Sequence, residues 1–265
     1  MNDLHRRLTA LAWSERAAIG TAVIDLPFGR AVVTEDLPMV YDQNMLWVSR
    51  PALANEVIAA AEGLAADAGW EHRNIEVSDA AVAAELRDSL AAAGYSESRH
   101  VTMVLPDSVP LPVPGAAVTV GPAGDHRALG RALLAQEPWV TAAAVLDQFA
   151  ERERRLATAV QVDAVVAPAD RPVSRCLLLS DGTLTEVDAV ATLREHRRHG
   201  WSSAVMACAI SVGRERGAPV VLVADQGDWP LQWYARLGFV AVGTGSQFRR
   251  WPNESALGGE GKPTD

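Results

Sequence analysis

The sequence is poor in lysine and in cysteine. Its one lysine, Lys262, lies near the C-terminus, so the chain has no Gly-x-x-x-x-Gly-Lys-[Ser/Thr] loop for nucleoside triphosphates. This absence disfavours a nucleotide-binding α/β protein. The two cysteines, Cys176 and Cys208, both lie in apolar runs. We expect them to be buried as small hydrophobic residues rather than to form a disulfide or a metal site.

The sequence also has no long uninterrupted apolar run and no signal-peptide core. A membrane span needs about 18 or more apolar residues, so we expect a cytoplasmic protein that does not enter membranes. The net charge of −9 argues against general binding to nucleic acids or to anionic membrane surfaces. The basic group of Arg194, Arg197 and Arg198 is therefore a local feature against an acidic background.

Proline is concentrated in one segment, which we interpret as a domain boundary. Residues 106–115 (PDSVPLPVPG) contain four prolines and a glycine. This density excludes helix and interior strand and favours an extended linker. The predicted domains therefore cover residues 1–105 and 116–251. The polar, glycine-rich residues 252–265 are predicted to be a disordered tail.

Hydrophobic periodicity predicts the same order of elements at the end of each half. Residues 45–105 and 184–242 each give strand, helix, strand, helix, a Gly-aromatic pair and a last strand. The pair is Gly94-Tyr95 in the first half and Gly238-Phe239 in the second. We interpret this as a weak internal repeat; two unrelated α/β units are the alternative.

Local signals set the ends of several elements. Gly69 is predicted to end the helix over residues 52–68, and Ser78 to be the N-cap of the helix that follows. Residues 174–179 and 184–192 are predicted to pair as a hairpin around Ser180-Asp181-Gly182. The last strand is predicted to end at Val242.

The most informative stretch joins an apolar strand to an amphipathic helix that begins at Trp201. Between them the chain reads Arg197-Arg-His-Gly-Trp-Ser-Ser203. The first turn of a helix has unpaired N–H groups and a partial positive charge, and together these stabilise a phosphate. Gly200 allows a close approach or a positive φ. An ordinary solvated loop is the alternative.

The first half differs at the corresponding place. It reads Ser49-Arg-Pro-Ala-Leu-Ala-Asn55, without a glycine and with a proline near the start of the helix. If only one half binds a phosphate-bearing ligand, we therefore expect it to be the second.

Three features together resemble the GNAT superfamily of acyl-CoA-dependent N-acyltransferases: the strand over residues 186–192, the loop Arg197-x-x-Gly200-x-Ser202, and Tyr234-Ala-Arg-Leu-Gly-Phe239. The pyrophosphate loop of that family reads [Arg/Gln]-x-x-Gly-x-[Gly/Ala], and its closing helix commonly reads Tyr-x-x-Leu-Gly-Phe. Ser202 departs from the family pattern but is small enough that we expect binding to survive. The resemblance covers residues 184–242 by motif and 117–251 by element order.

The resemblance implies a tandem GNAT protein of the α/β (α+β) class. Each of two GNAT-like domains would have a mixed, mostly antiparallel sheet flanked by helices. The first domain would be a degenerate GNAT-like unit without a cofactor loop, and the second would bind acetyl-CoA as a cosubstrate.

The resemblance also implies where the cosubstrate lies. The pantetheine would pair with the backbone of Val190, Ala191 and Thr192 like an added strand. The pyrophosphate would contact the segment that follows, made of Arg197, Arg198, His199, Gly200, Trp201, Ser202 and Ser203. His196 and His199 are interpreted as solvated or phosphate-adjacent, because no third residue has the spacing of a metal ligand.

Acylation of an amine needs a base, because an ammonium ion has no lone pair with which to attack. Glu186 is our first candidate, since it lies eleven residues before Arg197, where some histone-type members of the superfamily carry a base glutamate. Asp188 shares its strand face and is the reserve candidate. Tyr234 matches the family tyrosine that can protonate the leaving thiolate. The alternatives are a salt bridge or a substrate contact for Glu186 and simple packing for Tyr234.

The leading hypothesis is an N-acetyltransferase that acts on a primary amine of a small molecule or a protein. A catalytically silent acyl-CoA sensor or interaction module is the alternative. The acceptor, the length of the acyl group and the choice between monomer and homodimer stay open. Tyr41, Asp42 and Asn44 could contact a substrate, with an ordinary turn as the simpler interpretation.

Overall fold

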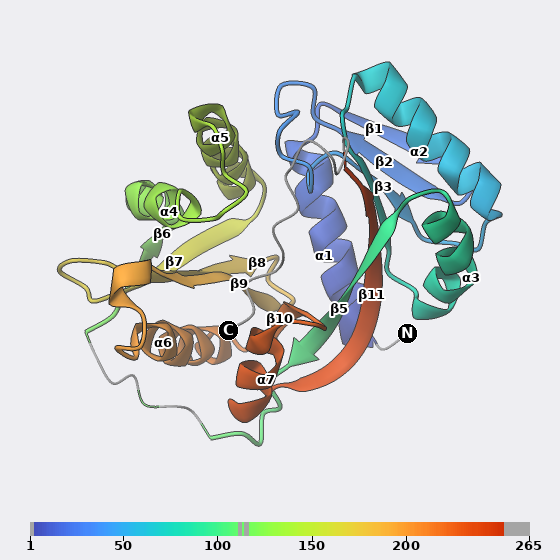
Figure 1. The fold of residues 1–265 in the computed structure, drawn as a ribbon. Coiled ribbons are helices and arrows are strands. Elements are labelled where there is room, and N and C mark those ends of the chain that lie inside the picture. The colour runs from blue at the N-terminus through green and yellow to red at the C-terminus, as the bar shows by residue number, and fades with distance from the viewer. Residues whose placement is uncertain (1–2, 111–112, 114–116, 252–265) are drawn as a thin grey trace. The chain divides into compact units, whose positions relative to one another are not determined.

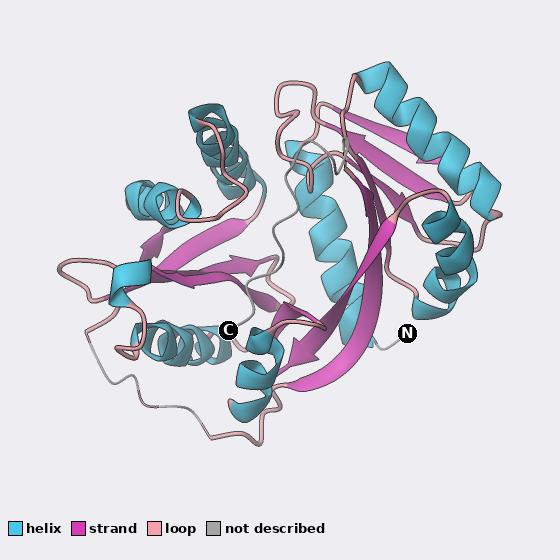
Figure 2. Cartoon of the chain, viewed as in Figure 1, coloured by secondary structure: helices cyan, strands magenta, loops and turns pink. Residues whose placement is uncertain are grey.

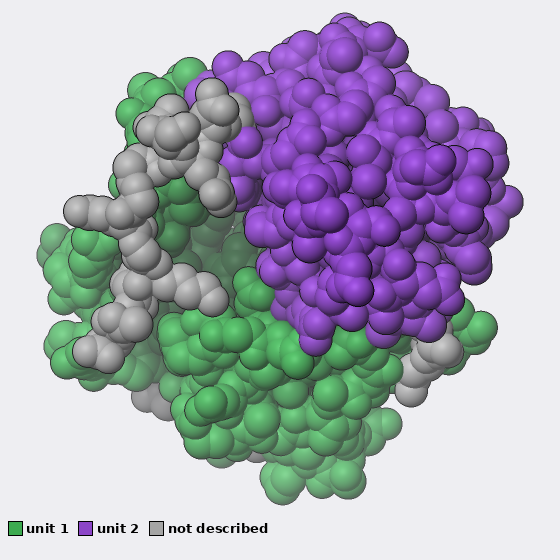
Figure 3. All heavy atoms as spheres, turned by 45° about the vertical axis from the view of Figure 1, so that its right-hand side comes forward, with its two compact units in different colours: residues 1–19, 100–244 green, residues 20–99, 245–265 purple. Residues whose placement is uncertain are grey.

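The computed structural model describes residues 3–110, 113 and 117–251 of the chain. The predicted tail and part of the predicted linker lie outside these residues. The chain divides into two compact units, coloured separately in Figure 3: unit 1 comprises residues 1–19 and 100–244, and unit 2 comprises residues 20–99 and 245–265. Strands and flanking helices make up both units (Figure 2). No helix in the described ranges is long and apolar enough to cross a membrane.

Unit 2 has a hairpin followed by a β-α-β-α-β series. In chain order its elements are β1 (Ala22–Leu26), β2 (Gly29–Val33), β3 (Met45–Val48), α2 (Ala54–Ala68), β4 (Arg73–Val77), α3 (Ala80–Ala92) and the first part of β5 (Ser96–Val104). β3 and β4 pair in parallel, whereas β2 pairs antiparallel with both β1 and β3. The buried residues of α2 and α3 pack on these strands, in a core that contains Val57, Ala61, Leu86 and Leu90.

Helix ends in unit 2 follow local chemistry. Gly69 ends α2 with a φ of 67°, which confirms the predicted cap. At the start of α3 the carboxylate of Asp79 accepts hydrogen bonds from two backbone N–H groups. The prediction of Ser78 as this N-cap was wrong by one residue, because the Ser78 hydroxyl instead accepts a hydrogen bond from the indole of Trp47 at 2.9 Å.

Unit 1 contains the same β-α-β-α-β series with additional elements before it. In chain order its elements are α1 (Asp3–Ile19), the second part of β5, β6 (Thr119–Pro122), the 3-10 turn η1 (Ala123–His126), α4 (Arg127–Leu134), α5 (Ala143–Ala159), β7 (Gln161–Ala167), β8 (Ser174–Ser180), β9 (Thr185–Thr192), the 3-10 turn η2 (Arg194–His196), α6 (Trp201–Glu215), β10 (Val220–Asp225), α7 (Trp229–Arg236) and the first part of β11 (Val240–Arg250). The predicted hairpin is confirmed as β8 and β9.

The strands of unit 1 have the order β5-β10-β9-β8-β7-β6, in which β9 and β10 are parallel and the other neighbours are antiparallel. Figure 1 shows α6 on one face of β7, β8 and β9, and α4 and α5 on the other. The core under α6 contains Val205, Ala209 and Ile210, packed against strand residues that include Val187 and Leu222. This core holds both ends of the strand–turn–helix segment that the sequence analysis singled out.

Two strands pass from one unit to the other. β5 and β11 are neighbours in the strand order, and residues 96–99 and 245–250 of them belong to unit 2. The prediction that the last strand ends at Val242 was wrong, because β11 continues to Arg250 and pairs with β4 from Ser246 onwards. The glycines at 243 and 245 weaken the local strand signal, so this half of β11 is set by its partner strand and by the burial of Phe248.

The compact units therefore differ from the two consecutive domains predicted from the linker. The N-terminal helix α1 belongs with the later residues in unit 1, and residues 245–251 belong with unit 2. The interpretation of the earlier half as a degenerate GNAT-like domain stays a prediction.

Candidate functional site

The parallel strands β9 and β10 separate soon after they begin. Their register comprises two pairs, Thr185 with Val220 and Glu186 with Val221. Beyond this point, β10 continues to Asp225 along β5, and β9 continues to Thr192 along β8. The later residues of β9 thus have a partner strand on one side only. Such an edge offers backbone N–H and C=O groups to an extended ligand.

A β-bulge lies on β9 within this separated part. Asp188 is opposite Leu177 and Ala191 is opposite Arg175, so two residues of β9 face the single residue Cys176 of β8. One of the two, Ala189, has a φ of 49°. A bulge of this kind bends its strand and interrupts regular pairing, which gives a local reason for the divergence of β9 from β10.

The turn after β9 contains two residues in the left-handed region. Arg197 is extended, with a φ of −67° and a ψ of 160°, whereas Arg198 has a φ of 65° and Gly200 a φ of 81°. These positive φ angles turn the chain sharply between the end of β9 and the start of α6. A Cβ atom added at Gly200 would meet open space, and no side chain caps the start of α6. The N–H groups of this helix end therefore face a region that a phosphate could fill.

Hydroxyl groups connect the end of β9 to the start of α6. Thr192 donates a hydrogen bond to Ser174 at 2.8 Å, and Ser174 donates to the carbonyl of Ala191 at 3.0 Å. Since the Thr192 hydrogen is used in this way, the 2.7 Å contact between Thr192 and Ser202 must have Ser202 as its donor. The side chain by which Ser202 departs from the family pattern is therefore held against β9 and directed away from the turn.

The basic residues of the turn have different surroundings. Arg197 and Arg198 are exposed, and the Nε of Arg197 donates to the carbonyl of Thr192 at 3.3 Å. Arg194 is instead bound to the end of α4, because its guanidinium donates to the carbonyl of Gln136 and its N–H donates to the Gln136 side chain. His199 donates from Nδ1 to the carbonyl of Arg197 at 2.8 Å. Arg197 and Arg198 remain the predicted anion-binding cations, and Arg194 has a structural contact.

The candidate bases lie on β9 where the strands part. Glu186 is partly buried and Asp188 is exposed. Burial raises the pKa of Glu186 well above its usual value, and the nearby negative charges of Asp188 and Glu15 raise it further. A carboxyl group with a raised pKa can accept a proton from an amine more readily than an ordinary glutamate can. The structure thus brings both predicted candidates to one place but adds an unpredicted third carboxyl, Glu15 of α1.

Tyr234 lies on α7 and is 9% exposed. Its ring packs against Trp233 and Phe239 in the core of unit 1. Burial raises its pKa to about 12, and the negative charge of Asp188 adds to the shift. The phenol is therefore protonated throughout the neutral range. Both cysteines are free.

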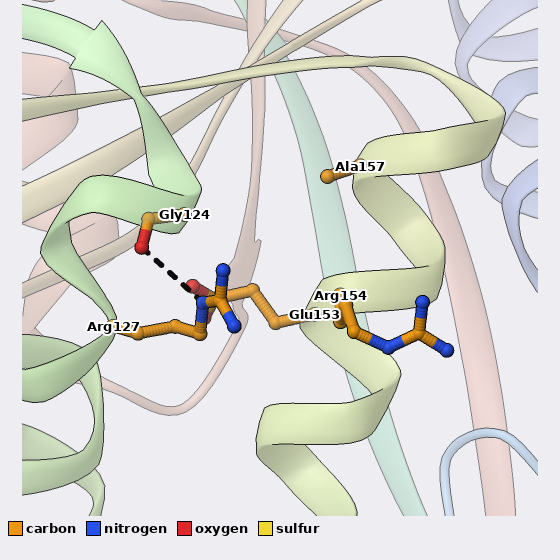
Figure 4. Close-up of a pocket in the computed structure, with 5 residues that line it drawn as sticks. All are labelled: Gly124, Arg127, Glu153, Arg154 and Ala157. Atoms are coloured by element: carbon orange, nitrogen blue, oxygen red, sulfur yellow. Dashed lines mark hydrogen bonds between the residues drawn. The ribbon is translucent and has the colours of Figure 1, made fainter.

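Two other features of the chain do not belong to this site. Figure 4 shows a small hollow between η1, α4 and α5, where Arg127 donates to the carbonyl of Gly124 at 3.2 Å. It contains none of the predicted site residues. In unit 2, Asn44 is fully buried and binds the backbone of Thr34 and Leu37, so the turn interpretation describes its role.

Three residues that shape the site were not predicted from the sequence: Glu15, Gln136 and Ser174. Glu15 had a local signal, because it is a charged residue at helical spacing from Leu8 and Leu11. Gln136, in the turn after α4, and Ser174 of β8 reach the site through contacts that join residues 58 and 18 positions apart in the chain. No local pattern marks such residues.

The sequence matches no family model and no curated protein sequence. Solved structures do match. A GCN5-related N-acetyltransferase from Kribbella flavida matches with a TM-score of 0.64 and 20% identity, covering 97% of this chain and 99% of that one. A tandem GNAT protein from the clavulanic acid biosynthesis pathway matches with a TM-score of 0.53 and 13% identity, covering 94% of this chain and 96% of that one.

A functionally unknown conserved protein from Staphylococcus epidermidis matches with a TM-score of 0.66 and 15% identity, covering 88% of this chain and 94% of that one. The chain therefore has the fold of tandem GNAT proteins. This confirms the predicted fold class, a mixed and mostly antiparallel sheet flanked by helices.

Proposed function

We propose that this protein is an acyl-CoA-dependent N-acyltransferase that transfers an acetyl group from acetyl-CoA to a primary amine. The observation that carries the proposal is the combination of a separated β9–β10 pair with an open turn at the start of α6, in which Arg198 and Gly200 have positive φ angles. The first feature suits an extended arm, and the second suits a diphosphate. The GNAT fold supports the same assignment.

The residues for the cosubstrate are those on the free edge of β9 and in the turn. Val190, Ala191 and Thr192 would hydrogen-bond the pantetheine arm, and the N–H groups from Arg197 to Ser203 would hold the pyrophosphate. Arg197 and Arg198 would add charge-assisted contacts. When bound, acetyl-CoA supplies a thioester whose carbonyl carbon is open to attack.

Glu186 removes a proton from the acceptor's ammonium group, directly or through one water molecule. The amine lone pair then forms the C–N bond, the C–S bond breaks, and the electron pair leaves on sulfur. Glu186 suits this task because its raised pKa lets it hold the proton. Asp188 is the reserve candidate on the same strand.

Tyr234 donates a proton to the sulfur as the C–S bond breaks. Its phenol remains protonated at neutral pH because burial raises its pKa to about 12. Transfer of this proton to the thiolate gives free thiol. The nitrogen of the newly formed amide loses its excess proton, which returns to the Tyr234 phenolate, and the proton held by Glu186 returns to solvent. The reaction conserves charge and needs no other reactant.

The direct test is release of free CoA thiol when the full-length protein is incubated with acetyl-CoA and a panel of small primary amines and lysine-containing peptides. We expect acceptor-dependent release, lowered about 100-fold by Glu186→Gln. A protein that binds acetyl-CoA but releases no thiol with any acceptor would be a sensor or interaction module, and the transferase proposal would be wrong. Propionyl-CoA and longer donors in the same assay define the acyl length.

A further inference from the structure

The helix α1 carries a buried glutamate on its apolar stripe. The buried residues of this helix include Leu8, Leu11, Glu15 and Ile19, which recur at helical spacing on one face. Glu15 is 4% exposed. A charged residue at such a position is costly unless it has a partner or a function.

This stripe faces the strands at the point where they separate. Leu8 and Leu11 pack against Leu184, which directly precedes β9, and against Val221 of β10. Val221 is the register partner of Glu186 in the last pair before the strands part. Because side chains alternate along a strand, Glu186 lies on the same face as Leu184. The stripe of α1 that contains Glu15 therefore lies over the face of β9 that contains Glu186.

One oxygen of Glu15 lacks a partner. Its Oε1 atom is buried and makes no hydrogen bond with any residue that the structure describes. An unpaired buried acceptor destabilises the folded state, because its lost hydrogen bonds to water are not replaced. This unpaired oxygen is a separate observation from the charges of Glu186 and Asp188, and a positive or hydrogen-bond-donating group would satisfy it.

We propose that Glu15 completes, with Glu186 and Asp188, an anionic face that binds the acceptor as an ammonium cation. The inference rests on the proposed acyl transfer and narrows its acceptor to aliphatic amines that are cationic at neutral pH. Glu15 acts here through its charge, as a positioning and specificity residue, and Glu186 receives the proton. Neutral arylamines and alcohols would gain nothing from such a face.

The charges around the cluster support this assignment. Burial raises the pKa of Glu15 to about 7; Arg16 of α1 and Arg152 of α5 act against the shift, whereas Asp188 and Asp181 add to it. Asp181 accepts hydrogen bonds from its own turn. Near neutral pH Glu15 is thus partly protonated, and a bound cation would displace its proton. Acceptor affinity should therefore rise as the pH rises through about 7.

The test uses the full-length protein and 1,4-diaminobutane as probe, with 1,4-butanediol as its neutral counterpart, in titration calorimetry without acyl-CoA. We expect the wild-type protein to bind the diamine, more tightly at about pH 8 than at about pH 6, and the diol at least about tenfold more weakly. Glu15→Gln should weaken diamine binding about tenfold and flatten its pH dependence. Glu15→Asp should stay within about threefold of wild type, because it keeps the charge.

Glu215→Gln is the matched control, because it removes the same charge from the exposed far end of α6. It should leave diamine binding unchanged. Equal binding by wild type and Glu15→Gln, or no diamine binding by wild type, would overturn the inference. Arg152→Gln should have the opposite effect to Glu15→Gln: it should bind the diamine more tightly than the wild-type protein does. Thiol release in the acceptor panel is read separately, so a failed transferase proposal and a failed role for Glu15 give different results.

Discussion

The two units contain the same β-α-β series, but their parallel strands end differently. In unit 2, β3 and β4 stay paired to their last residues, Val48 and Val77. In unit 1, β9 and β10 lose their pairing after Glu186 and Val221. A closed pair has no backbone groups to offer, whereas the separated pair leaves one edge of β9 available to an extended ligand.

The turns after β3 and β9 also differ in how their backbone N–H groups are used. After β3, the N–H groups of Ser49 and Arg50 both donate to the carbonyl of Phe28, at 3.0 and 3.1 Å. The chain itself thus occupies the amides that an anion would need. After β9, Arg198 and Gly200 take positive φ angles beside an uncapped helix end. The β-α-β series alone therefore does not provide an anion site; the proposed site also depends on backbone amides in the turn after β9.

Buried tyrosines give the sharpest test of this comparison. Tyr234 of unit 1 and Tyr95 of unit 2 are both buried, and burial raises the pKa of each. Tyr95 donates to Glu62 within unit 2. Tyr234→Phe should lower kcat about 100-fold with a small change in KM. Tyr95→Phe should leave kcat unchanged and lower the unfolding free energy by about 1 kcal/mol. Equal kcat values for the two variants would remove Tyr234 from the mechanism.

Removal of a carboxyl group should change protein stability in opposite directions at Glu97 and at Glu15. Glu97 of unit 2 is bound by Arg87, Arg99 and Ser246, and the Arg87 hydrogen bond chiefly lowers its pKa to about 2. Its contribution to stability is present above its unfolded pKa and is lost as the pH falls toward 2. Glu97→Gln should lower the unfolding free energy at neutral pH by about 1–3 kcal/mol.

Glu15 should behave in the opposite way. Its pKa is raised from 4.5 to about 7, so the folded state is favoured below pH 4.5 and loses that advantage as the pH rises through about 7. Glu15→Gln should therefore stabilise the protein at about pH 8 by about 2 kcal/mol and have little effect near pH 4. Urea unfolding at the two pH values measures this; destabilisation at pH 8 would mean that Glu15 has a structural partner.

Substitutions of the glycines at the two ends of α6 distinguish the effect of backbone strain on stability from an effect on cosubstrate binding. Gly200 and Gly217 have φ angles of 81° and 70°, and an added Cβ meets open space at both. Gly→Ala at either position should cost a similar stability, about 1 kcal/mol. Only Gly200→Ala should raise the KM for acetyl-CoA, by about tenfold, because it crowds the phosphate region. A similar rise in Gly217→Ala would mean that helix stability, and not local approach, controls cosubstrate binding.

The smallest effect is expected from exposed arginines. Arg198→Ala should raise the KM for acetyl-CoA about threefold, more at low salt than at high salt. Arg50→Ala, at the corresponding turn of unit 2, should have no effect on KM. Steady-state kinetics at two ionic strengths measures both variants, and an equal response would indicate a general charge effect rather than a local contact.

Much of the fold could be predicted because its signals are local. Gly69 as a helix end and the β8–β9 hairpin around Ser180 to Gly182 follow from turn and cap chemistry over a few residues. The parallel order of strand and helix in both halves was also visible in hydrophobic periodicity. The extension of β11 to Arg250 was not, because its pairing with β4 joins residues far apart in the chain.

The candidate site also contains residues that could be predicted from local sequence and residues that could not. Gly200 and its neighbours were predicted from a contiguous stretch, and that stretch has the expected open turn. The position of Glu15 beside Glu186 could not be predicted, since it depends on how α1 packs on Leu184 and Val221.

The elements, the glycine turn before α6 and the difference between the two halves follow from local sequence, because each is encoded within a few adjacent residues. The point where β9 and β10 separate, the carboxyl groups that share one face and the unit that contains α1 depend instead on the packing of the folded chain. These depend on side chains brought together from distant parts of the chain, and their pKa values depend on the burial that results.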